Sequence, residues 1–71
     1  MEGKYPKQLK IIALLEERGI SHRIFAERIG MKQDSLSRKL GGSRRFTAQE
    51  MVAISAALRE PIERLFVSGV S

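Results

Sequence analysis

The sequence contains no cysteine, no tryptophan and only one histidine among its 71 residues. Without cysteine the chain can form no disulfide, no thiolate zinc site and no cysteine nucleophile. The single histidine, His22, has no carboxylates at ligand spacing around it, so we expect no metal site and no cofactor. The serines lack an evident base, and no glycine-rich phosphate loop is present. We therefore predict no catalytic residues, no small-molecule substrate and no enzymatic activity.

Long apolar runs are missing as well. The longest are Ile11–Leu15 and Met51–Ile54, far short of the roughly 20 residues that cross a bilayer. Residues 1–6 lack the charged-then-apolar order of a secretory signal. We therefore expect no transmembrane helix, no membrane partner and a cytoplasmic location.

Acidic residues are outnumbered, with 8 against 13 lysines and arginines, which gives a net charge of +5. The excess is concentrated between Lys32 and Arg45, where five basic residues accompany one acid, Asp34. Such clustering favours a polyanionic partner, whereas a basic total alone would also fit a solvated charged face. The composition, 42% hydrophobic and 30% charged, predicts one globular domain over residues 1–71 with frayed ends at about 1–4 and 68–71.

Apolar spacing and capping residues predict an all-α fold, a compact bundle of about five short helices. The first helix is expected from Pro6, which suits a first helical turn, to Arg18, with Gly19 as the stop signal. Ser21 is expected to cap the second helix, which ends before a left-handed Gly30. No segment alternates with period two over a useful length, so we expect no strand.

The third predicted helix begins at Gln33 and ends at the Gly41–Gly42 pair. Its only apolar residues are Leu36 and Leu40, four positions apart on one side of the helix. The other faces of this helix are therefore polar and available to a partner.

Capping signals are clearest at the fourth predicted helix. Thr47 and Glu50 form a capping box, and Phe46 with Met51 makes the matching hydrophobic staple. Further along, Pro61 suits the first position of a last short helix.

Apolar residues at helical spacing supply one expected core. Its members are Leu9, Ile12, Phe25, Leu36, Met51, Ile54, Ala57, Leu58, Leu65 and Phe66. Other apolar positions do not all fit into it, and some are candidates for a partner surface, a dimer contact or scattered surface residues. They are Ile11, Leu14, Val52, Val67 and Val70.

The stretch from Ser21 to Gly42 has the pattern of helix, glycine-centred turn and helix. Ala26 is small where the next helix crosses closely, Gly30 turns without steric cost, and Leu36 fills the space between the helices. This stretch, together with the two predicted helices after it, resembles the phage repressor and Cro family. The resemblance implies a lambda-repressor-like DNA-binding domain whose third helix enters the major groove.

The resemblance also implies roles for individual residues, matched position by position. The candidates for base reading are Gln33, Asp34, Ser37 and Arg38. The candidates for phosphate contacts are His22, Arg23, Lys32, Ser35, Lys39, Arg44 and Arg45, and Ser35 fits either role. Arginine can hold guanine through O6 and N7, glutamine suits adenine, and aspartate accepts from the cytosine amino group.

Three positions depart from the family pattern. His22 stands where glutamine is common, so its phosphate contact is open to change or to pH sensitivity. Lys32 occupies the cap position of the third helix, where serine or threonine is usual. Lys39 occupies a position that is often apolar, with Leu40 buried instead, which leaves the rotation of the third helix open.

The leading hypothesis is a small bacterial or phage-encoded transcriptional repressor that binds double-stranded DNA as a homodimer on a palindromic operator. One alternative is a protein-interaction module, antitoxin-like or adaptor, and another is DNA binding without sequence preference. Single residues have alternatives too. Asp34 fits a carboxylate that the helix dipole favours, and Arg38 fits an ordinary solvated surface residue.

Overall fold

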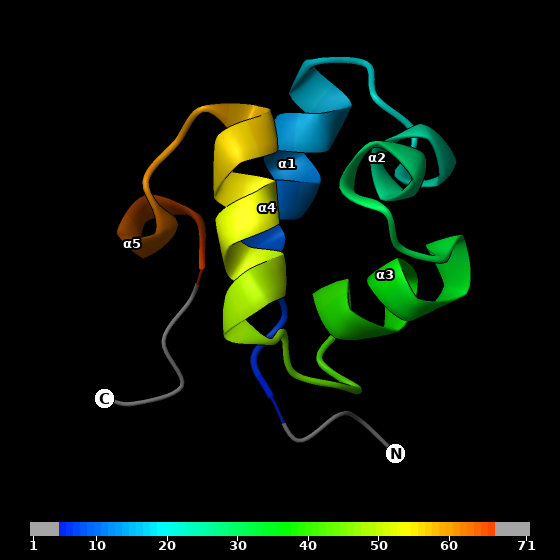
Figure 1. The fold of residues 1–71 in the computed structure, drawn as a ribbon, viewed down its shortest axis with the longest axis vertical. Coiled ribbons are helices and arrows are strands. Elements are labelled where there is room, and N and C mark those ends of the chain that lie inside the picture. The colour runs from blue at the N-terminus through cyan, green and yellow to red at the C-terminus, as the bar shows by residue number, and fades with distance from the viewer. Residues whose placement is uncertain (1–4, 67–71) are drawn as a thin grey trace.

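The computed structural model describes residues 5–66, which form five helices and, within that range, no strand (Figure 1). The helices are α1 (Leu9–Glu17), α2 (His22–Ile29), α3 (Gln33–Leu40), α4 (Ala48–Leu58) and α5 (Ile62–Leu65). α4 stands in front of α1, with α2 and α3 on one side and α5 on the other. The all-α prediction is confirmed, and the ends expected to fray, 1–4 and 68–71, lie outside the described residues.

The start of α1 differs from the sequence prediction. The helix begins at Leu9 and not at Pro6, and its N-cap residue Gln8 makes no side-chain cap. The backbone N–H groups before it are used elsewhere, because Tyr5 donates to the carbonyl of Gly42 at 3.1 Å and Gln8 donates to that of Leu40 at 2.9 Å. These carbonyls lie at the end of α3, where a helix cannot pair them itself. A tertiary contact has therefore overridden the local helix signal at Pro6.

The caps of α2 and α4 are confirmed. The Ser21 side chain accepts from the backbone N–H of Ile24 at 3.1 Å, and Gly30 ends α2 in the left-handed conformation at φ 73°. At α4, the Glu50 N–H donates to Thr47 Oγ1 at 3.1 Å, and the Thr47 N–H donates to Glu50 Oε1 at 2.9 Å. Two self-capped helices thus flank α3 on either side in the chain.

Two expectations near the end of the chain need adjustment. Pro61 is the N-cap of α5 and not its first residue, a shift of one position. Ala57 is exposed, although the sequence placed it on the buried side of α4. α4 is apolar on nearly every side, so its sequence alone does not define which side faces the core.

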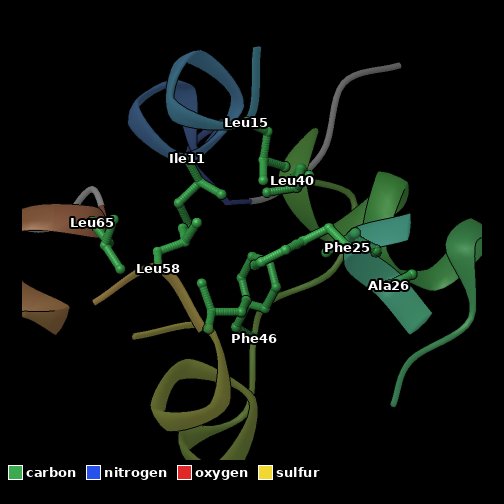
Figure 2. Close-up of a cluster of buried hydrophobic side chains, with 10 residues drawn as sticks. Ile11, Leu15, Phe25, Ala26, Leu40, Phe46, Leu58 and Leu65 are labelled. Atoms are coloured by element: carbon green, nitrogen blue, oxygen red, sulfur yellow. The ribbon is translucent and has the colours of Figure 1, made fainter. Parts of the chain in front are cut away.

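The core gathers side chains from all five helices and from the loop before α4 (Figure 2). Its buried members are Ile11, Leu15, Phe25, Ala26, Leu36, Leu40, Phe46, Ile54, Leu58 and Leu65. The sequence-based prediction exchanged the buried and exposed sides of α1: Ile11 is fully buried, whereas Leu9 is 63% exposed. Residues two apart on a helix point about 200° apart, so burying one exposes the other.

The remaining apolar residues divide between core edge and surface. Ile12, Leu14 and Phe66 are half-buried against the core. Val52 is exposed as expected, and Val67 and Val70 lie outside the described residues.

Candidate nucleic-acid interface

Two features set the geometry of the α2–α3 pair: the close crossing of the two helices and the hydrogen bond that closes the turn between them. Ala26 and Leu36 are both fully buried, as the predicted close crossing of the two helices requires. After the left-handed Gly30, the N–H of Met31 donates to the carbonyl of Ala26 at 2.8 Å and closes the turn. The orientation of α3 relative to α2 is therefore fixed by backbone geometry and by the core.

The outer side of α3 carries the four residues predicted to read bases. Gln33, Asp34, Ser37 and Arg38 are all exposed. They lie away from Leu36 and Leu40, which anchor the helix in the core. Ser35 is half-buried between the two sides. The structure thus brings the four candidates together on one polar, solvent-facing surface.

Two of these four side chains pair with each other. Arg38 Nη2 lies 3.4 Å from Asp34 Oδ2, one helical turn apart, and the two side chains are 55% and 82% exposed. An exposed pair of this kind contributes only about 0.3–0.5 kcal/mol. Breaking this ion pair therefore costs little free energy, so each of the two groups is available to a new partner.

Of the residues predicted to contact phosphates, some lie at the two ends of α3 and others at the start of α2. Lys32 is the N-cap of α3 and makes no side-chain cap, so its exposed ammonium has no helix-capping role. Arg44 and Arg45 are exposed in the loop between α3 and α4. At the start of α2, His22 is half-buried and Arg23 is exposed. Arg23 Nη1 lies 3.8 Å from Glu27 Oε2. The basic cluster thus continues past both ends of α3.

Lys39 is unlike the other cations. Its Nζ lies 2.5 Å from Glu50 Oε2, and the two side chains are only 13% and 24% exposed. In the sequence, Glu50 was predictable as a capping residue and Lys39 departs from the family pattern, but no local pattern connects the two residues. A capping glutamate accepts the backbone N–H through one carboxylate oxygen, so its second oxygen is left to accept from another donor. This spare acceptor was the one sequence feature that could have indicated a partner for Glu50.

Burial and two neighbouring residues, Lys39 and Thr47, set the pKa of Glu50. Burial alone would raise the pKa of its carboxyl group, but the hydrogen bond from Lys39, the backbone N–H of Thr47 and the charge of Lys39 lower it below the ordinary value of 4.5. Since the pKa is lower in the folded state, ionised Glu50 stabilises the fold above about pH 4.5. That contribution is lost as the pH falls through the folded-state pKa.

We accordingly expect Glu50→Gln to melt below the wild type at pH 7 and to approach it as the pH falls toward 3. The amide keeps an acceptor but loses the charge-assisted part of the bonds, about 1 kcal/mol or 4–8 °C in Tm. Thermal melts at half-unit pH steps measure the gap, with Glu63→Gln on an exposed site as the control. A gap that stayed constant from pH 7 to pH 3 would contradict this role for Glu50.

Neither a metal cluster nor a membrane span is found in the part of the chain that the structure describes. No group of three or more His, Cys, Asp or Glu residues in 5–66 is placed to hold a metal ion. No helix in this range is long and apolar enough to cross a bilayer.

Comparison with known families agrees with this geometry. The family model described as a Cro/C1-type HTH DNA-binding domain matches residues 10–67. The match begins within α1 and extends beyond α5, so it includes the whole α2–turn–α3 unit and the basic loop after it. Among curated proteins no match is found. The chain belongs to the Cro/C1-type helix-turn-helix DNA-binding domain family.

Proposed function

We propose that this DNA-binding regulator reads the major groove with α3 and acts as a small repressor encoded by a bacterium or phage. The observation that carries the proposal is the outer side of α3. Four exposed polar side chains lie there on a helix whose apolar side is anchored by Leu36 and Leu40. A major groove about 12 Å wide admits one α-helix, and exposed polar residues on its outer side can reach base edges.

The Asp34–Arg38 pair suggests one base pair that α3 would read. Guanine O6 and cytosine N4 share a Watson–Crick hydrogen bond, so these groups lie about 2.9 Å apart in the major groove. Arg38 offers a donor and Asp34 an acceptor 3.4 Å apart, the complementary arrangement at a similar spacing. We propose that the two side chains exchange each other for a single G·C pair, in which Arg38 donates to guanine O6 and N7 and Asp34 accepts from cytosine N4. Gln33 and Ser37 would read neighbouring bases.

The remaining cations would fix the protein on the DNA backbone. We propose phosphate contacts for the basic residues His22, Arg23, Lys32, Arg44 and Arg45 and for the hydroxyl group of Ser35. Each neutralised phosphate adds about 0.9 to the slope of log affinity against log salt. The net charge of +5 favours association with any DNA, and the outer side of α3 would supply the sequence preference.

The size of the domain favours two copies on each operator. The described fold measures 28 × 24 × 23 Å, whereas successive major grooves on one face of DNA recur about every 34 Å. One copy is therefore too small to place recognition residues in two successive grooves. We propose a homodimer on a palindromic operator in the cytoplasm, where occupation of a promoter represses transcription.

The test is enrichment of bound duplexes from a randomised DNA pool at physiological salt. We expect a palindromic motif whose half-sites each contain an invariant G·C pair. In that motif, 7-deazaguanine removes N7 and should weaken binding by about 5- to 150-fold, corresponding to 1–3 kcal/mol. Inosine is the control, because it lacks only the minor-groove amino group.

The other outcomes each point elsewhere. Retention without a motif would indicate binding without sequence preference. No retention would overturn DNA binding by this chain and leave the protein-interaction alternative. A motif insensitive to 7-deazaguanine would remove the proposed G·C reading while leaving sequence-specific binding in place.

A further inference from the structure

We propose that Lys39 is a positioning residue for DNA reading and not a phosphate contact, because its ion pair with Glu50 fixes the last turn of α3 to the first turn of α4. The inference rests on the proposed function, since it assigns a role within the same DNA-reading surface. It concerns a side chain that does not itself face the DNA.

The Glu50 carboxylate connects two elements through its two oxygens. Oε1 accepts from the backbone N–H of Thr47 at 2.9 Å, and Oε2 accepts from Lys39 Nζ at 2.5 Å. The Thr47 side chain in turn accepts from the Glu50 N–H at 3.1 Å. Glu50 is therefore held by the cap of α4 and cannot follow Lys39 if α3 moves. An ion pair with one partner so fixed restrains the other.

This connection matters because the backbones of α3 and α4 lie close together at few points, and their other link is through the shared apolar core. The backbone of α3 approaches mainly that of α2, and it comes near those of α1 and α4 at fewer points. Leu36 and Leu40 anchor one side of α3, and Lys39 adds a restraint on a second side. Two restraints on different sides fix the rotation of a helix about its axis, which one apolar side alone leaves looser. Rotation of α3 decides which side chains face the bases.

The same pair also closes the base of the basic loop. Residues 41–47 lie between Lys39 at the end of α3 and the α4 cap that holds Glu50. Arg44 and Arg45 are exposed within this segment. With both ends of the loop held, these two cations keep a defined position relative to Arg38 on α3. The ion pair thus sets the geometry between proposed phosphate contacts and proposed base contacts.

Charge argues against a phosphate role for Lys39. Its ammonium is already neutralised by a carboxylate, and both side chains are largely shielded from water. Transfer of Lys39 to a phosphate would leave Glu50 ionised, half-buried and near a polyanion, which is unfavourable. Arg44 and Arg45 reach solvent without breaking any such pair.

The test uses Lys39→Met and Glu50→Gln, with affinity measured against salt on the enriched duplex and on a scrambled duplex. Methionine keeps an apolar side chain of similar length, and glutamine keeps an acceptor for the Thr47 N–H. We expect the ratio of the two affinities to fall about fivefold in both variants, with the salt slope on the scrambled duplex unchanged for Lys39→Met. Lys39→Arg keeps the pair and should keep the ratio.

A phosphate contact predicts the opposite pattern. Lys39→Met would then lower the salt slope by about 0.9 and weaken both duplexes equally, and Glu50→Gln would leave the ratio unchanged. Arg45→Gln is the positive control for such a loss of slope. Circular dichroism at the assay temperature confirms that each variant is folded, so an unchanged ratio in folded Lys39→Met would overturn the positioning role. Failure of the wild type to prefer any duplex would instead overturn the proposed function.

Discussion

Replacement of Arg38 with glutamate is expected to weaken binding to the enriched duplex by at least about a hundredfold. The variant would lose the proposed bidentate contact to guanine, a kind of contact that contributes about 1–3 kcal/mol, and would bring a carboxylate toward the DNA. The new side chain would also lie one turn from Asp34, so two like charges would share the surface that faces the groove. Fluorescence anisotropy with the labelled duplex measures the loss.

The matched control is Arg64→Glu on α5, an exposed arginine with the same change of charge. α5 and α3 lie on opposite sides of α4, so Arg64 is away from the proposed interface (Figure 1). We expect Arg64→Glu to reduce affinity by less than about tenfold, since distant charges are screened beyond a Debye length. Equal losses in the two variants would mean that net charge, and not the α3 surface, governs binding.

The second large effect is expected at Gly42, where alanine should lower the stability by about 3 kcal/mol. Gly42 has a φ of +94°, and a Cβ atom there would lie 2.3 Å from the carbonyl oxygen of Tyr5. Alanine would therefore strain the backbone by about 1–2 kcal/mol and push the 5–8 segment away. The hydrogen bonds from Tyr5 and Gln8 would weaken, at about 1 kcal/mol each.

Thermal unfolding measures this effect, with Gly19→Ala as the control. Gly19 has a similar positive φ of +68° but no atom within 4 Å of the added Cβ position, so it isolates the backbone strain. We expect a Tm loss of at least about 12 °C for Gly42→Ala and roughly half of that or less for Gly19→Ala. Similar losses in both variants would argue against the close approach of Tyr5 to Gly42.

The features that the sequence predicted correctly depend on neighbours within one or two helical turns. Ser21 reaches Ile24 three residues away, and Thr47 reaches Glu50 at the same distance. The outer side of α3 was also indicated by the sequence, because Leu36 and Leu40 are its only apolar residues, and their burial resolves the rotation that Lys39 had left open. Local chemistry and a sparse apolar pattern were sufficient in these places.

The errors lie where the local pattern permits several arrangements. α1 has apolar residues at five consecutive positions from Ile11, so periodicity could not separate Leu9 from Ile11 as the buried residue. Pro6 favoured a helix start, but hydrogen bonds to the distant end of α3 decided the backbone around it. These outcomes depend on tertiary contacts that no short window contains.

The Lys39–Glu50 contact shows the same limit in the candidate site. Both residues were singled out in the sequence: Lys39 as a cation at a position that is often apolar, and Glu50 as the glutamate of the capping box. Their pairing depends on where α4 lies relative to α3, which is set by the core and by a loop of irregular structure. The exposure of the four proposed base-reading residues was thus predictable, whereas the contact proposed to hold them in register was not.

The hydrogen bonds from Tyr5 and Gln8 to the end of α3 mean that the helix-turn-helix depends on a chain segment outside itself. During synthesis the 5–8 segment leaves the ribosome before α3, so its N–H groups cannot reach these carbonyls until α3 has followed. If the α2–turn–α3 stretch were transplanted into a protein without an equivalent N-terminal segment, the carbonyls of Leu40 and Gly42 would lose these donors. Grafting only the outward side chains of α3 onto a host that keeps its own N-terminal segment would avoid this loss.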